Sequence, residues 1–198
     1  MMPMRRFLLT LAFALCSVAV HAEQDLYNPL AVGLKWDVDV ELNTPGGKAV
    51  NGTAVREITG TEKIGHFNYF AVVTSFTGLP QVKDFTVYRR KSSRGIYSIY
   101  SGDPSKQEIL EAALPLEVGQ TWKTVVGMQM ITSTVESKET VTAGGKTYEN
   151  CIKVTYKSSD GQIKGTYYQA PDVGNVLETS SRSGATYKFT LKAYSGLK

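Results

Sequence analysis

Hydrophobic and polar residues alternate strictly along several segments of this chain. In WDVDVEL, residues 36–42, apolar side chains hold the even positions and acidic side chains the odd ones. ATYKFTLKA, residues 185–193, alternates in the same way near the other end. A period of two is typical of a β-strand with one buried face, and turn signals such as Gly144-Gly145 separate the runs. The pattern predicts an all-β chain, built as a meander of antiparallel hairpins.

One segment carries helix signals instead. In DPSKQEILEAAL, residues 103–114, Asp103 can cap a helix and Pro104 can occupy its first position. The segment is short, and an extended linker is the alternative. We therefore expect at most one short helix in the whole fold.

An eight-residue phrase occurs twice. PLAVGLKW spans residues 29–36 and PLEVGQTW spans residues 115–122, with Pro, Leu, Val, Gly and Trp at identical spacing. Proline holds the backbone extended, glycine permits a turn, and an indole can close the end of a core. The phrase predicts the same kinked start of a strand at two places. The expected structural anchors are Pro29, Gly33, Trp36, Pro115, Gly119 and Trp122.

Further matches extend this similarity over both halves of the chain. YFAVVTSF from Tyr69 parallels NCIKVTYK from Asn150, and VYRRK from Val87 parallels YYQAP from Tyr167. Self-similarity at a fixed period is the signature of a repeated module. We expect two tandem repeats of about five strands each, which together form a curved sheet or an open barrel. The expected division is a leader at 1–22, a first β-repeat at 23–100, a linker or short helix at 101–113, and a second β-repeat at 114–198.

The segment FNYFAVVTSF, residues 67–76, differs from its counterpart in the second half because it is apolar on both faces. Such a strand is covered on both sides or lines a cavity. The first alternative, which we favour, is another element packed over it; the second is an apolar groove for a lipid, an acyl chain or a peptide. Tyrosines outside this segment can add a surface that stacks on a sugar or a peptide. The candidate ligand-binding residues are Phe67, Phe70, Val72, Phe76, Tyr97 and Tyr167.

The first 22 residues have the pattern of a secretory signal peptide. Arg5 and Arg6 supply a positive start, an apolar run follows at residues 7–15, and small residues precede a cleavage site after Ala22. No later segment is long and apolar enough to cross a membrane as a helix. We expect cleavage after Ala22 and a periplasmic or secreted protein.

The charge balance narrows the range of partners. Removing the leader takes two of the 22 Lys+Arg residues and leaves 20 against 18 Asp+Glu, a net charge near +2. Such a balance argues against a dedicated nucleic-acid binder. One basic patch departs from it, at Arg89, Arg90, Lys91 and Arg94. We favour a solvated hairpin end that discourages edge pairing; a contact with an anionic headgroup or a glycan phosphate is the alternative.

Few groups suited to catalysis remain in the mature chain. It keeps one histidine, His66, and one cysteine, Cys151. A Cys–His dyad can assemble from distant segments, but Cys151 aligns with Phe70 of the other repeat, which favours a packing role. A zinc site needs three or four such ligands, and the acidic residues of 36–42 fit a solvated strand face. We expect no catalytic residue, no metal site and no cofactor.

The phrase Y-x-P-L-x-V-G-x-x-W, complete from Tyr27 to Trp36 and nearly complete at 114–122, resembles one found in a broad group of secreted bacterial proteins. Some members of that group are called TapB-like and others are domains of unknown function. A Y-x-A-P-x-V-G-x-V segment, here residues 168–176, belongs to the same resemblance. The resemblance implies an antiparallel sheet curved into an open barrel, similar to the lipoprotein-carrier half-barrels of the Gram-negative envelope. It assigns no catalytic residue.

These observations lead to a functional expectation with two alternatives. We expect a non-catalytic periplasmic or secreted protein that binds an apolar or amphipathic ligand, such as a lipid, an acyl chain or a peptide, in a curved β-sheet. The first alternative is a structural or assembly protein of the cell envelope that acts through protein–protein contacts. The second alternative is a hydrolase. Nucleic acid is not an expected partner in any of the three.

Overall fold

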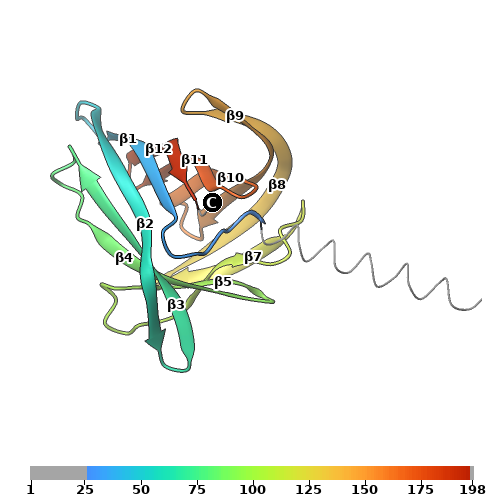
Figure 1. Cartoon of the computed structure of the whole chain (residues 1–198). Coiled ribbons are helices and arrows are strands. Elements are labelled where there is room, and N and C mark those ends of the chain that lie inside the picture. Colours follow the sequence, from blue (N-terminus) through green and yellow to red (C-terminus); the bar gives the residue numbers. More distant parts are fainter. Residues whose placement is uncertain (1–25, 197–198) are drawn as a thin grey trace, which may run out of the picture.

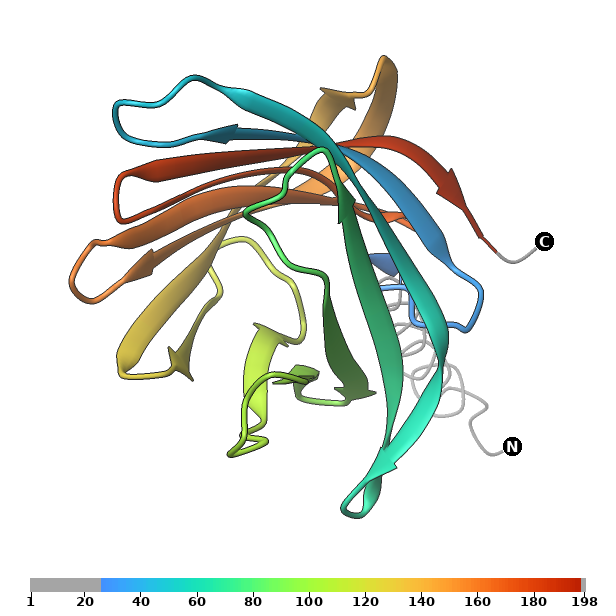
Figure 2. The ribbon, with the colours of Figure 1, turned by 90° about the vertical axis from the view of Figure 1, so that its left-hand side faces the viewer.

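A computed structural model describes residues 26–196 of the chain. Twelve antiparallel strands form one sheet in the order β6-β5-β4-β3-β2-β1-β12-β11-β10-β9-β8-β7, and this described part contains no helix. The sheet curls into a nearly closed barrel (Figures 1 and 2). The all-β, curved-sheet prediction is confirmed. The strands are β1 (Lys35–Asn43), β2 (Val50–Ile64), β3 (Phe67–Thr77), β4 (Phe85–Ser92), β5 (Gly95–Tyr100), β6 (Ile109–Ala113), β7 (Thr121–Val126), β8 (Gln129–Ala143), β9 (Lys146–Ser158), β10 (Ile163–Ala170), β11 (Gly174–Arg182) and β12 (Ala185–Ser195).

Bulges allow the sheet to bend. The register shifts between Ile58 and Gly60 of β2 against β3, and between Val135 and Ser137 of β8 against β9. An extra residue on one strand of a pair increases the local twist and curves the strand. These two bulged strands, β2 and β8, are also the longest, with 15 residues each. Each half of the sheet therefore contains one long, bent strand.

Each half of the chain is a six-strand meander, and the two halves begin in the same way. The amide of Gly33 donates to the carbonyl of Ile58 at 2.8 Å, and the amide of Gly119 donates to the carbonyl of Val135 at 2.8 Å. Both glycines adopt positive φ, 92° and 89°, a conformation that costs glycine little. Each half has six strands, where about five were expected, and the division into two repeats stays a prediction.

The two tryptophans that open β1 and β7 occupy comparable positions. Trp36 and Trp122 are 7% and 5% exposed, and each indole donates a hydrogen bond to a backbone carbonyl of a different element. Trp36 Nε1 donates to the oxygen of Val173 at 2.6 Å. Trp122 Nε1 donates to the oxygen of Glu111 at 3.1 Å, which ties β7 to β6 where the two ends of the sheet meet.

Of the two alternatives left open for residues 103–114, a short helix and an extended segment, the structure has the extended one. Residues 103–106 lie in turns, and β6 begins at Ile109 and pairs with β5. Two carboxylates of this segment, Glu108 and Glu111, bind arginines of β4 on opposite faces of the sheet. An extended backbone places residues three apart on opposite faces, whereas a helix would place them on one. Tertiary ion pairs therefore outweigh the local helix signals.

The middle of strand β3 has buried residues on both faces, for two different reasons. Val72 and Phe76 point into the barrel, while Tyr69 points outward and is only 3% exposed. The Tyr69 hydroxyl donates to Glu108 and accepts from Arg90, so side chains of β4 and of the segment before β6 cover this face. Other side chains thus cover the outward face at Tyr69, and the inward face lines a cavity; the ligand groove stays a prediction.

The signal-peptide prediction for residues 1–22 lies outside the described residues. Within 26–196 we find no helix with the length and hydrophobicity that a membrane crossing requires.

Candidate functional site

The interior of the barrel holds a cavity of about 300 Å³. Its walls come from both halves of the chain and from the segment that precedes β1, and they mix two kinds of side chain. The apolar part includes Leu30, Trp36, Ile58, Val72, Ile96 and Ile131. The polar part includes Asn28, Arg56, Arg89, Glu111, Gln169, Asn175 and Glu178. The volume lies at the lower end of the range for small-molecule sites.

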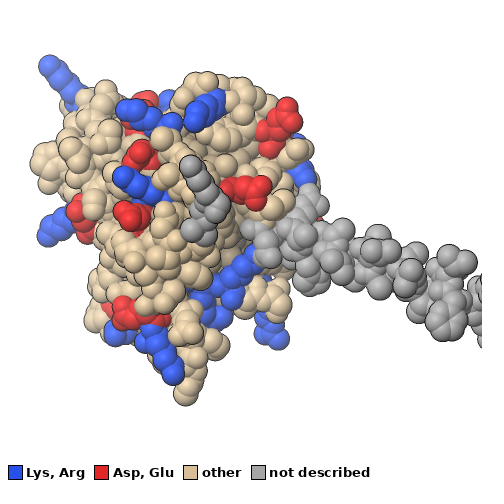
Figure 3. Space-filling view, viewed as in Figure 1, with Lys and Arg blue, Asp and Glu red and all other residues tan. Residues whose placement is uncertain are grey.

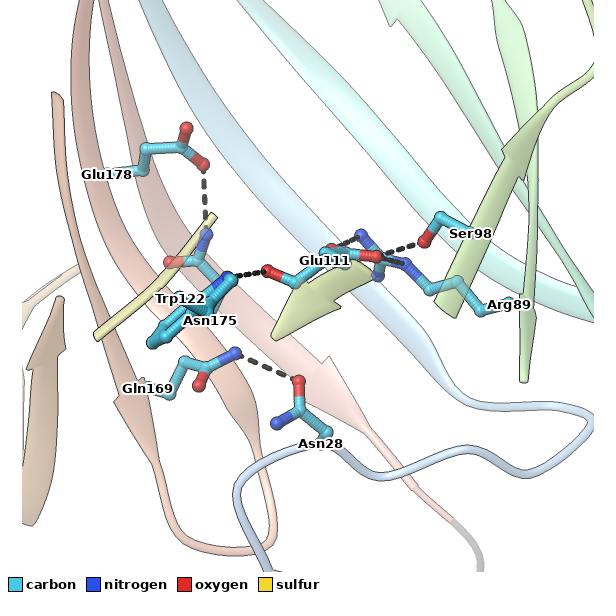
Figure 4. Close-up of polar contacts among 8 residues, drawn as sticks. All are labelled: Asn28, Arg89, Ser98, Glu111, Trp122, Gln169, Asn175 and Glu178. Atoms are coloured by element: carbon cyan, nitrogen blue, oxygen red, sulfur yellow. Dashed lines mark hydrogen bonds and ion pairs between the residues drawn. The ribbon is translucent and has the colours of Figure 1, made fainter. Parts of the chain in front are cut away.

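An arginine and a glutamate form an ion pair inside the barrel. Arg89 Nε donates to Glu111 Oε2 at 2.8 Å, and a second guanidinium nitrogen of Arg89 donates to Glu111 Oε1. The Ser98 hydroxyl donates to the same carboxylate, as Figure 4 shows. Glu111 is the residue that the β5–β6 register shift leaves unpaired, and its side chain points inward. Its carboxylate thus accepts three charge-assisted hydrogen bonds and is fixed in place.

A second glutamate faces the cavity from β11. Glu178 accepts a hydrogen bond from the Tyr156 hydroxyl at 3.2 Å and from Asn175 Nδ2 at 3.0 Å. Arg56 of β2 lines the same cavity. Burial lowers the pKa of the Arg56 guanidinium, the charge of Arg89 lowers it further, and Glu178 opposes both effects. Arginine nevertheless stays charged in proteins.

Two cations and two anions therefore share this interior, and their formal charges cancel. Three tyrosines stand among them. Burial raises the pKa of Tyr100, Tyr156 and Tyr167, and nearby glutamates raise it further. All three remain neutral hydroxyl groups at ordinary pH. Tyr100 is 47% exposed although it lines the cavity.

Side-chain amides gather at another part of the cavity wall. Gln169 Nε2 donates to Asn28 Oδ1 at 2.9 Å, and this bond joins β10 to the segment before β1 (Figure 4). Four buried polar atoms have no hydrogen-bond partner among the described residues, and all four belong to residues that line this cavity. They are Asn28 Nδ2, Thr124 Oγ1, Gln169 Oε1 and Asn175 Oδ1.

A second cavity of about 250 Å³ adjoins the first. Arg56, Val72, Arg89, Tyr100, Glu111 and Glu178 line both cavities. The remaining walls of the second are almost entirely apolar: Val38, Ala54, Thr74, Phe76, Phe85, Val87 and Phe189. The barrel interior thus has an apolar compartment and a mixed compartment, which meet at the charged residues.

The six candidate ligand-binding residues do not form one site. Val72 and Phe76 line the cavities, as does Tyr167, and the partly buried Phe70 packs against a core cluster. Phe67 and Tyr97 lie on the outer face instead, with the Arg90 guanidinium carbon 4.1 Å and 4.5 Å from their ring centroids. The structure thus brings three of the six to the interior cavities.

The basic patch expected at 89–94 is not one surface. Arg89 points into the barrel, whereas Arg90 points outward and binds Glu108 through two nitrogens at 2.6 Å and 2.7 Å. Consecutive residues of a strand face opposite sides, so this pair cannot contact one anionic ligand. Lys91 is partly buried, which lowers its pKa, and Arg94 is exposed at the hairpin. Figure 3 shows positive and negative side chains interspersed on the face that it presents.

The two catalytic candidates have different surroundings. Cys151 is completely buried in β9, where its thiol donates to the carbonyl of Tyr148 at 3.4 Å, and burial raises its pKa. His66 is exposed in the turn between β2 and β3. Over residues 26–196, no three His, Cys, Asp or Glu side chains lie close enough together to hold a metal ion.

Several interior residues were missed in the sequence. Arg56 and Glu178 each occupy a strand position where the alternation predicts an apolar residue. Ala54 and Ile58 lie two residues before and after Arg56, and Val176 lies two residues before Glu178. A charged residue in an apolar phase is the signal that could have identified them. The amides of Asn28 and Asn175 lie outside such patterns, and only the folded chain places them together.

Comparisons with known proteins extend this description of the fold. No protein-family model matches the chain, and no curated protein matches it. Among solved structures, it is similar to a Bacteroides fragilis protein assigned as exported, with a YmcC-like fold, at 14% identity and a TM-score of 0.54; the match covers 86% of this chain and 99% of that one. This similarity shows a shared fold and nothing about a ligand.

Two more distant structures were also found. A Parabacteroides distasonis protein assigned as a lipoprotein has 12% identity and a TM-score of 0.46, over 86% of this chain and 98% of that one. A LolA superfamily protein from Nitrosomonas europaea has 9% identity and a TM-score of 0.39, over 92% and 93%. We draw no functional conclusion from likeness at this level.

Proposed function

We propose that this chain is a non-catalytic exported protein that binds a small amphipathic ligand inside its barrel. The observation that carries the proposal is the composition of the interior. A mixed compartment with fixed polar groups adjoins a second compartment, whose walls are almost entirely apolar apart from the charged residues and Tyr100 that line both. A ligand with a polar end and an apolar end complements both compartments at once.

The energetics of the interior agree with this proposal. A protein core without a binding role is normally filled by apolar side chains at high packing density. This barrel instead keeps Arg56, Glu178 and the Arg89–Glu111 pair in its interior, although charged groups are costly to remove from water. Retaining them beside open volume is typical of a site that orients a ligand through a few polar contacts.

A displacement assay with an environment-sensitive apolar dye, N-phenyl-1-naphthylamine, tests the proposal. The dye should bind the wild-type protein with enhanced fluorescence. Thr124→Phe should abolish this enhancement because Thr124 points into the cavity from β7. Thr121→Phe is the matched control, since Thr121 is exposed on the same strand. Equal dye binding by both variants would contradict a site in the interior.

One surface feature favours a second candidate function, engagement of another envelope protein. The β7–β8 hairpin exposes Val125, Val126, Met128 and Met130, and Met128 is fully exposed. Val125 is paired with Met130 and shares its face of the hairpin, whereas Val126 faces the cavity; exposed apolar side chains that lie together are common at interaction surfaces. A photo-crosslinking residue at position 128 should recover one reproducible partner if this function is correct. Recovery of no specific partner would leave ligand binding as the better proposal.

A further inference from the structure

We propose that the polar end of the ligand is uncharged and carries several hydroxyl groups, as a sugar or polyol head does. This inference rests on the proposed function and specifies the chemistry of its polar compartment. Its binding groups are the four unpartnered polar atoms of Asn28, Thr124, Gln169 and Asn175. They come from the segment before β1 and from β7, β10 and β11.

The hydrogen bonds of the amides define which atoms remain free. Gln169 uses its Nε2 group toward Asn28, and Asn175 uses its Nδ2 group toward Glu178. The free atoms are therefore two acceptors, Gln169 Oε1 and Asn175 Oδ1, one donor, Asn28 Nδ2, and one hydroxyl that can do either, Thr124 Oγ1. A complementary ligand must donate at least two hydrogen bonds and accept at least one.

Burial makes these atoms sensitive to their occupant. Gln169 is 8% exposed, so its free carbonyl oxygen is largely removed from bulk water. A buried acceptor without a partner destabilises the protein, and a ligand donor that reaches it relieves that cost. A ligand that donates hydrogen bonds to this wall should therefore bind more tightly than a ligand without donors.

This requirement excludes several common head groups. A carboxylate and a phosphodiester accept hydrogen bonds but donate none at neutral pH, and a quaternary ammonium does neither. A primary ammonium donates but does not accept. A hydroxyl group donates and accepts through one atom, so a head with several hydroxyls fits two acceptors, one donor and one hydroxyl.

The charged residues of the interior also favour an uncharged ligand head. Arg89 is already paired with Glu111, and Glu178 already accepts from Tyr156 and Asn175. Because the two arginines and two glutamates cancel, a charged head would lose its hydration without meeting a net opposite charge. A neutral head avoids this cost.

The test compares probes that share a decyl chain and differ only in the head. Decyl glucoside, decanoate and decyltrimethylammonium would be titrated below their micelle concentrations, with the fluorescence of Trp36 and Trp122 as the signal. These are the two tryptophans of the chain, and Trp36 lines the cavity. We expect decyl glucoside to bind about tenfold more tightly than either charged probe, since a site built for hydroxyl groups rejects analogues that lack them.

Variants then show whether the preference comes from the amides. Gln169→Leu and, independently, Asn175→Ala should each reduce the glucoside preference severalfold and leave decanoate binding unchanged. Gln162→Leu, at an exposed position, is the control and should keep the full preference. Asn175 is only partly buried, so its variant keeps the test valid if Gln169→Leu does not fold.

The outcomes separate this inference from the proposed function. If none of the three probes binds, the proposed function fails. If the probes bind but the charged heads bind equally well or better, ligand binding stands and the hydroxyl-rich head is wrong. If the preference survives in both amide variants, the head lies elsewhere and the assignment of these residues is overturned.

Discussion

Replacing Arg89 by methionine should destabilise the barrel from within. The substitution keeps an unbranched side chain of similar length and removes the guanidinium. Among the described residues, Glu111 would keep one hydrogen bond, from Ser98. A carboxylate left in this interior without its cation is an uncompensated charge.

The structure sets the size of the effect. Breaking a fully buried ion pair costs about 3–5 kcal/mol, whereas an exposed pair contributes about 0–1 kcal/mol. The side chains of Arg89 and Glu111 keep 25% and 35% of their surface accessible, and both line the cavity. We expect an intermediate loss of about 2 kcal/mol in the free energy of unfolding.

Urea denaturation followed by tryptophan fluorescence measures this loss, provided that the dependence on urea concentration keeps its wild-type slope. The double variant Arg89→Met/Glu111→Leu removes both charges and should recover most of the stability. Lys188→Met is the control because the Lys188–Glu41 pair is 46% and 50% exposed, and it should cost less than about 0.5 kcal/mol. If Arg89→Met costs no more than this control, or the double variant is no more stable than the single one, the reasoning is refuted.

Three further outcomes are expected. Trp36→Phe leaves the carbonyl of Val173 without its 2.6 Å donor and should cost about 1–2 kcal/mol in urea denaturation; a neutral effect would show that the bond is dispensable. Burial raises the pKa of Cys151, so iodoacetamide at pH 8 should modify the protein only after unfolding, and rapid native labelling would contradict this. Burial raises the pKa of Glu108, but the hydrogen bonds that Glu108 accepts, first of all from Arg90, lower it by more. The net result is a pKa below 4.5. The stabilisation by Glu108 is present above pH 4.5 and lost as the pH falls through the lower native pKa; Glu108→Gln should therefore flatten the fall in stability in acid, and an unchanged pH profile would contradict the pairing.

The strands could be predicted from the sequence because a period of two directly reports which side chains share a face. The alternation in residues 36–42 corresponds to β1, Lys35–Asn43. The segment at 103–114 gave a helix signal instead, because the ion pairs of Glu108 and Glu111 with β4 are not visible in local sequence. Arg89 and Arg90 lie on opposite faces because they are consecutive residues of β4. This conclusion requires that residues 85–92 first be assigned to a strand.

The candidate site was less accessible to sequence reasoning. Its amides come from Asn28, Gln169 and Asn175, which are distant in sequence and meet only through the register of the barrel and the position of the segment before β1. The apolar residues Val72 and Phe76 were found because strand β3 is unusually apolar. A polar residue that interrupts such a pattern, like Arg56, indicates a polar group in the interior, and a search for catalytic motifs does not detect it.

Native mass spectrometry of protein purified from the organism that encodes it shows whether the barrel holds a ligand. We expect a second species, heavier than the polypeptide by the mass of one small amphiphile, which disappears in Thr124→Phe and persists in Thr121→Phe. A wild-type protein that repeatedly carries no added mass, or an adduct that both variants retain, would contradict a ligand held inside the barrel.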